Sequence, residues 1–93
     1  MLIGICEISL YLPNSNSLKD KRSILAGYIN SLKKRYNISI AEIDKKNSWK
    51  KSIIGIACIN DNRRLIDSVM EKIISDTETQ PEIQLIDYWF SVN

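Results

Sequence analysis

The sequence of 93 residues contains no histidine. Histidine is the commonest general base in enzymes and the commonest metal ligand, so its absence excludes a Ser-His-Asp or Cys-His site within the chain. The two cysteines, Cys6 and Cys58, stand far apart and do not form the clusters that zinc requires. With only three glycines, the chain also lacks the GxGxxG and Walker A loops that bind phosphates. We therefore predict no catalytic residues, no cofactor and no metal.

Long hydrophobic runs and targeting signals are also missing. The first residues carry no basic segment, and Glu7 interrupts the apolar run that follows, which argues against a signal peptide. No segment approaches the roughly 20 apolar residues of a membrane-spanning helix. A disulfide framework in so short a chain would need more than two cysteines. We expect a cytoplasmic protein that makes no membrane contact, with both cysteines as buried thiols.

The composition is that of an ordinary globular domain. Hydrophobic residues make up 44% and charged residues 26%, with a net charge of +2. This is enough apolar surface to offset chain entropy. The length suits one domain, covering residues 1–93.

Periodic apolar residues divide the chain into alternating strands and helices. The final loop contains Pro81, and the polar stretch in the middle connects two strands. The predicted elements are a strand at 2–12, a helix at 18–35, strands at 38–44 and 53–59, a helix after the turn at 60–62, a loop at 77–82 and a strand at 83–92. This order predicts an α+β fold, the ferredoxin-like βαββαβ sandwich, in which two helices cover one face of a four-stranded antiparallel sheet.

Alternation within the strands predicts which side chains face the core. Even-numbered residues from Leu2 to Leu12 are uniformly apolar, so they should face the helices. In the last strand, one alternation groups residues 83, 85 and 89, and the other groups residues 86, 88, 90 and 92. One of the two apolar sets must then face outward, and an exposed apolar patch usually indicates a partner. Self-association through the sheet is the interpretation that we favour for this face.

Two carboxylates on the second strand are candidates for acid–base chemistry. Glu42 and Asp44 lie two residues apart, so an unbroken strand would direct both to the same face. They could bind a cation or exchange protons, but a solvated face paired with Lys45 and Lys46 is the more economical interpretation.

The first basic segment opens the first helix. Ser17 should cap this helix, with Asp20 three residues later. Free N–H groups and partial positive charge at a helix start favour anions. We predict phosphate contacts from Lys19, Lys21 and Arg22. The alternative is a capped helix with an ordinary charged exterior.

The second basic segment is the connection between the second and third strands. Four lysines could neutralise phosphates there, and Trp49 could stack on an unpaired base. Alternatively, the segment is a solvated loop whose tryptophan folds back onto the domain edge. The predicted binding residues are Lys45, Lys46, Trp49, Lys50 and Lys51.

Several segments resemble the small bacterial YlxP-like family. Residues 12–22, LPNSNSLKDKR, are similar to its LPxSxSLKxKR signature, and residues 37–44, NISIAEID, to its NVSVAEVD segment. Trp49 followed by IGIA at 54–57 resembles its W…LGVA pattern, and residues 61–64, DNRR, its NDRR turn. The resemblance covers essentially the whole chain and implies a ferredoxin-like fold without an established activity.

The family resemblance also carries a hint about partners. Genes of the YlxP-like family often lie beside those of translation and ribosome-maturation factors, which implies RNA or the ribosome. This chain has Lys45 where many members carry a histidine, and Lys50 and Lys51 where glutamine and arginine are common. We therefore hypothesise a non-catalytic RNA- or ribosome-associated binding domain. The alternative is a homo-oligomeric regulatory or small-ligand-binding domain, such as a homodimer.

Overall fold

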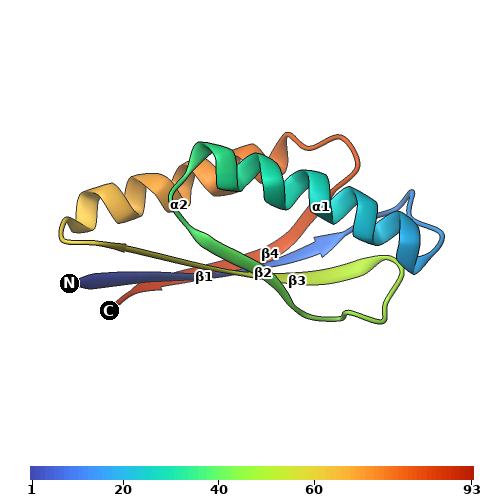
Figure 1. Cartoon of the computed structure of the whole chain (residues 1–93), viewed down its shortest axis with the longest axis horizontal. Coiled ribbons are helices and arrows are strands. Elements are labelled where there is room, and N and C mark those ends of the chain that lie inside the picture. Colours follow the sequence, from blue (N-terminus) through green and yellow to red (C-terminus); the bar gives the residue numbers. More distant parts are fainter.

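Both helices lie on one face of a single antiparallel sheet in the computed structural model, which describes residues 1–93 (Figure 1). The elements are β1 (Leu2–Tyr11), α1 (Leu18–Arg35), β2 (Ser39–Asp44), β3 (Lys51–Asn60), α2 (Arg63–Glu78) and β4 (Gln84–Val92). The strands lie in the order β2-β3-β1-β4. This arrangement confirms the predicted ferredoxin-like fold. Neither helix combines the length and the hydrophobicity of a membrane span.

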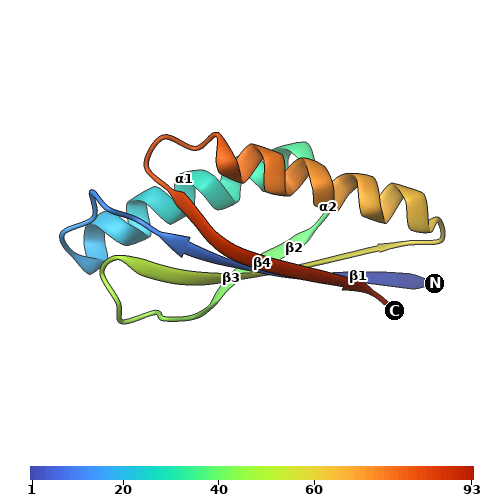
Figure 2. The same cartoon turned by 180° about the vertical axis from the view of Figure 1, so that it is seen from behind.

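Strand β1 lies at the centre of the sheet and pairs along its length with β3 and β4. Its helix-facing side chains from Cys6 to Leu10 are buried, as the alternation predicted, and Leu12 continues the same row. They join residues from α1, α2 and β3 in one core cluster. The other side of the sheet, which we call the open face, has no helix over it (Figure 2).

Helix α1 begins and ends where the sequence predicted. The Ser17 hydroxyl accepts a hydrogen bond of 3.0 Å from the Asp20 backbone N–H, and the Asp20 carboxylate accepts one of 3.0 Å from the Asn16 N–H. These bonds satisfy donors that a helix start leaves free. The last turn carries basic residues, which suit the negative end of the helix dipole.

Helix α2 extends further than predicted, because Thr77 belongs to the helix and not to the loop after it. The Thr77 hydroxyl donates to the Ile73 carbonyl at 2.8 Å, so the Tyr28 hydroxyl, 2.7 Å away, donates to Thr77. Burial raises the pKa of Tyr28 to about 12. Thr77, which was predicted to lie in a loop, therefore forms a buried hydrogen bond between the two helices.

Strand β4 changes its alternation at a β-bulge. Leu10 pairs with Leu85, while the preceding Ser9 pairs with Asp87, so Ile86 is one extra residue in the ladder. An extra residue reverses the sides on which later residues lie. The prediction of one uninterrupted alternation was therefore wrong. Leu85, Tyr88, Phe90 and Val92 pair with the helix-facing row of β1, whereas Ile86 and Trp89 belong to the open face.

Candidate nucleic-acid interface

The two basic segments of the sequence meet at one end of the molecule. The loop before α1 and the connection between β2 and β3 lie together there, and both chain termini lie at the opposite end (Figures 1 and 2). The Leu12 N–H donates to the Lys50 carbonyl at 2.7 Å and joins the two segments directly. We call residues 12–22 and 42–52 the basic end.

Positive charge is concentrated at the basic end. It holds seven of the 13 lysines and arginines but only three of the 11 carboxylates, a net charge of +4. The remaining residues hold six cationic side chains and eight carboxylates, a net charge of −2. The small overall charge of +2 therefore conceals a strongly polarised molecule.

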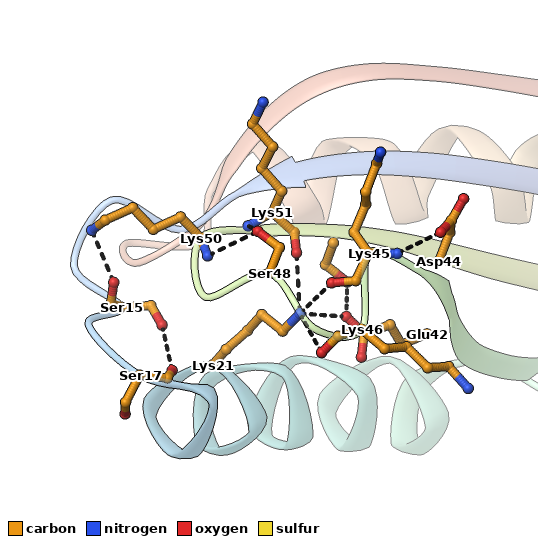
Figure 3. Close-up of polar contacts among 11 residues, drawn as sticks. Ser15, Ser17, Lys21, Glu42, Asp44, Lys45, Lys46, Ser48, Lys50 and Lys51 are labelled. Carbon is orange, nitrogen blue, oxygen red and sulfur yellow. Dashed lines mark hydrogen bonds and ion pairs between the residues drawn. The ribbon is translucent and has the colours of Figure 1, made fainter.

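Lys21 is the buried centre of this end and is 0% exposed. Its ammonium donates to the backbone carbonyls of Lys45 at 2.7 Å, Lys51 at 3.1 Å and Lys46 at 3.3 Å (Figure 3). It also lies 3.0 Å from the Glu42 carboxylate. An ammonium has three protons, so these four acceptors use all of them. Lys21 fastens the β2–β3 connection to α1 and is not available to a phosphate, contrary to its predicted role.

Glu42 completes this buried cluster. One of its oxygens accepts from the Ser52 hydroxyl at 2.7 Å as well as facing Lys21, so the carboxylate compensates the buried positive charge. Asp44 does not join it. A bulge between the two residues pairs Asp44 with Ile53 of the open face, and its carboxylate accepts from the Lys45 N–H at 2.7 Å. The prediction that the two carboxylates share a face was therefore wrong, because the bulge adds one residue.

Lys50 is a second tether. Its ammonium donates to the carbonyls of Pro13 and Ser15, both at 2.8 Å, and so ties the β2–β3 connection to the loop before α1. Ser15 is itself buried, and its hydroxyl donates to the Ser17 carbonyl at 3.1 Å. Lys50 thus shares with Lys21 the task of ordering two loops, and its charge is largely committed to them.

The backbone at Lys45 adopts a left-handed conformation with φ of 60°, which is uncommon for a residue with a side chain. Several hydrogen bonds hold it there. The Lys45 carbonyl accepts from Lys21 and from the Ser48 N–H at 3.0 Å, while the Ser48 hydroxyl accepts from the Lys51 N–H at 3.1 Å. The connection is therefore a folded turn that presents its side chains in fixed directions.

The other predicted binding residues are free. Their side chains form no ion pair and no hydrogen bond, and Trp49 is 57% exposed, so it does not fold back onto the domain edge. Figure 3 shows the ammonium groups of Lys45 and Lys51 pointing away from α1, while Lys46 extends in another direction. The free residues are Lys19, Arg22, Lys45, Lys46, Trp49 and Lys51.

The burial of Lys21 and Glu42 was missed by the sequence analysis, although one signal was present. Lys21 precedes the buried Leu25 by four residues and the buried Tyr28 by seven, so it lies on the core-facing stripe of α1. A lysine on such a stripe requires a buried partner.

Neither cysteine has the character of a nucleophile. Burial raises the pKa of the Cys6 thiol to about 11, and the charge of Glu7 adds to the effect. Burial also raises the pKa of Cys58, which is only partly opposed by a backbone hydrogen bond from Gly4. Both thiols are free and buried, as the sequence analysis predicted. Both remain protonated at neutral pH, and a thiol in that form is a poor nucleophile.

The comparisons with known proteins agree on fold and family. The chain is 26% identical to the uncharacterized protein YlxP of Bacillus subtilis (strain 168) over 83 residues, which covers 89% of this chain and 90% of the relative. The designed protein Foldit4 superposes with a TM-score of 0.57 at 9% identity, covering 100% of this chain and 97% of the design. The designed ferredoxin-fold protein LFR1 1 has a TM-score of 0.55 at 15% identity, covering 99% and 85%.

The designed proteins establish the likeness of fold alone, whereas the match to YlxP confirms the family resemblance seen in the sequence. The profile of the family described as "Protein of unknown function (DUF503)" matches residues 3–89. This chain therefore belongs to the DUF503 family, together with the YlxP-like proteins.

Proposed function

We propose that this chain is a non-catalytic RNA- or ribosome-associated binding domain that contacts phosphates through its basic end. One observation carries the proposal: two basic segments far apart in sequence are tied together by Lys21 and Lys50, which leaves other cations free at their surface. Free lysine and arginine side chains on a preformed surface favour a polyanion. The net charge of +4 at this end points the same way.

Trp49 supports a single-stranded RNA as the partner. It lies within the basic turn and is 57% exposed, although tryptophan normally buries most of its surface. An exposed indole beside cations can stack on an unpaired base while the lysines neutralise the neighbouring phosphates. Double-stranded RNA offers no such base.

The chemistry of the basic end supports a binding role over catalysis. The carboxylate of Glu42 is engaged by Lys21 and Ser52, and Asp44 lies across a bulge from it. A pair of carboxylates poised for acid–base work is therefore not assembled at this end.

The binding of a single-stranded RNA by charge-reduced variants tests the proposal. Replacing Lys45, Lys46 and Lys51 together by alanine should weaken binding at least about tenfold near physiological salt, and lower the slope of log K against log salt by about 2. The matched control replaces Lys33, Lys34 and Lys72, three exposed lysines on the helices outside the basic end. Equal losses in both triple variants, or no loss in the first, would refute the proposal.

Trp49 can be tested separately. Trp49→Ala should weaken binding of single-stranded RNA by about 1–3 kcal/mol with an unchanged salt slope, because stacking releases no counterions. Trp89→Ala is the control, since that indole is also exposed but lies on β4, outside the basic end. If both variants bind RNA as tightly as the parent chain, Trp49 is not a stacking residue.

A homo-oligomer remains the second candidate, and the open face favours it. Five large apolar side chains are exposed on that face, and an exposed apolar patch usually indicates a partner. Sedimentation of the protein at high concentration would show whether it assembles. A dimer that Ile59→Lys converts to a monomer would support this candidate, whereas a monomer throughout would remove it. The exposed residues are Ile5, Ile43, Ile59, Ile86 and Trp89.

A further inference from the structure

A cleft of about 330 Å³ lies on the open face where the sheet meets the basic end. Its walls come from β1, β3, β4 and the turn before β3, and they include Ser9, Lys45, Lys51, Ile53 and Ile86. The volume lies near the lower limit of small-molecule sites, roughly 300–1,000 Å³. The cleft is therefore suited to one compact ligand.

The sheet itself creates this hollow. Ser9 pairs with Ile53 on one side and with Asp87 on the other, so a small side chain lies between larger ones. Ile86 follows the helix-facing Leu85 at the bulge in β4, so it lies on the open face, where it is 62% exposed and forms the far wall. The extra residue also leaves Asp87, which pairs with Ser9, on the open face. The hollow is thus a product of register and not of a flexible loop.

The buried cluster of the basic end fixes the cationic wall of the cleft. Lys21 bonds the carbonyls of both Lys45 and Lys51, and the left-handed backbone at Lys45 is held by these bonds. The two ammonium groups point to the same side, away from α1, and have no carboxylate partner (Figure 3). One wall of an apolar hollow therefore carries two unpaired positive charges.

We propose that this cleft is a subsite for one nucleotide of a single-stranded RNA, an inference that rests on the RNA-binding function proposed above. The flat apolar face of an unstacked base packs against Ile53 and Ile86, while Lys45 and Lys51 hold its phosphate. The Ser9 hydroxyl makes no hydrogen bond within the chain and is free for the base or the ribose.

Two carboxylates limit what the cleft can accept. Asp44 pairs with Ile53 and Asp87 with Ser9, so both flank the hollow on the open face. Their negative charge confines a phosphate to the end formed by the two lysines and disfavours a ligand with several phosphates. A nucleoside monophosphate matches this distribution of charge better than a nucleoside triphosphate does.

Titration of the ¹⁵N-labelled protein with uridine 5′-monophosphate, uridine or inorganic phosphate, followed by NMR, tests the subsite. The monophosphate should shift the amide signals of Ser9, Ile53 and Ile86 and bind several-fold more tightly than either fragment. Lys51→Ala should weaken it at least about tenfold. Ile86→Ser should weaken it about fivefold through lost apolar contact. Because Ile86 is exposed, this change leaves the core intact.

Lys46→Ala is the control that separates the two proposals, because this lysine belongs to the basic end but does not line the cleft. It should weaken the binding of single-stranded RNA and leave the monophosphate titration unchanged. RNA binding without any monophosphate-induced shift at the cleft would overturn the subsite and leave the RNA-binding function standing. If every lysine variant binds both the RNA and the monophosphate as tightly as the parent chain, both the subsite and the RNA-binding function are overturned.

Discussion

The two ends of the molecule are held together in different ways. At the end with the termini, Ile3 and Asn93 exchange two backbone hydrogen bonds of 2.9 Å, and β1 packs closely under α2. At the basic end, the ladders give way to two irregular segments whose carbonyls find partners in the ammonium groups of Lys21 and Lys50. Backbone pairing orders the first end, and charged side chains order the second.

This difference shows how a small domain can present many charges on a well-ordered surface. Buried carbonyls without donors are costly, and two irregular segments packed together would leave several of them. Lysines 21 and 50 supply those donors from inside the basic end, so the remaining lysines need no intramolecular partner. The same residue type holds the loops and offers charge to a ligand, and only burial separates the two roles.

Removal of the buried ammonium should have the largest effect. Lys21→Met leaves Glu42 and the carbonyls around it without their donor, so we expect a loss of about 3–5 kcal/mol in the free energy of unfolding. Lys19→Met, a change at an exposed position two residues earlier, should cost far less. Urea denaturation measures both variants. Equal stability of the two would show that the basic end does not depend on Lys21.

At the end with the termini, a larger side chain in the close packing between β1 and α2 should lower the stability of the fold. A Cβ at Gly4 would lie 2.5 Å from Ile66 Cγ2 and 3.0 Å from Met70 Cε, and both side chains are buried. Gly4→Ala should therefore cost about 1–3 kcal/mol through overpacking. Gly27→Ala is the control, because its Cβ would meet open space on α1. This change should raise the free energy of unfolding by as much as about 1 kcal/mol, since alanine favours a helix more than glycine does. Stability gained in both variants would contradict the close packing at Gly4.

The second tether should have a smaller and more local effect. Lys50→Met removes the bonds to Pro13 and Ser15, at a cost of about 1–2 kcal/mol because the lysine is only half-buried. The Ser15 amide, which donates to the Leu12 carbonyl, should then exchange its hydrogen faster than in Lys46→Met. Unchanged exchange would mean that the loop before α1 holds itself in place.

The core between the two ends provides the smallest effect. Tyr28→Phe removes the bond to Thr77 and should cost about 1 kcal/mol at neutral pH. The pKa of Tyr28 rises from 10 to about 12 on folding, so its stabilising contribution is complete below pH 10 and is lost as the pH rises toward 12. In Tyr28→Phe, urea midpoints should therefore decline less steeply above pH 10. If the urea midpoint of the variant falls as steeply above pH 10 as that of the parent chain, other groups cause the loss of stability at alkaline pH.

Much of the fold followed from local sequence patterns. Alternation from Leu2 to Leu12 identified the core face of β1, and the Ser17 cap with the basic last turn defined α1. The bulges at Ile43 and Ile86 could not be predicted in this way, because a bulge is a property of two paired strands. The first bulge separates Glu42 from Asp44, and the second lies at the wall of the cleft.

The sequence indicated where the candidate site lies, but not which of its lysines hold the loops together and which remain free. Lysine-rich segments indicated both loops, but Lys21 and Lys50 were expected to be surface charges like their neighbours. Their roles depend on carbonyls 24 to 37 residues away along the chain, which no local pattern reveals. The stripe of α1 that contains Lys21 was the one clue.

The burial of Lys21 also makes this residue a natural reporter of motion. Reagents that acylate amines need a solvent-accessible, unprotonated nitrogen, and the Lys21 ammonium is enclosed by four acceptors. Its neighbours Lys19, Lys45, Lys46 and Lys51 should be modified at once, while Lys21 reacts only when the basic end opens. The difference between these modification rates, measured by mass spectrometry, would report how often the β2–β3 connection opens.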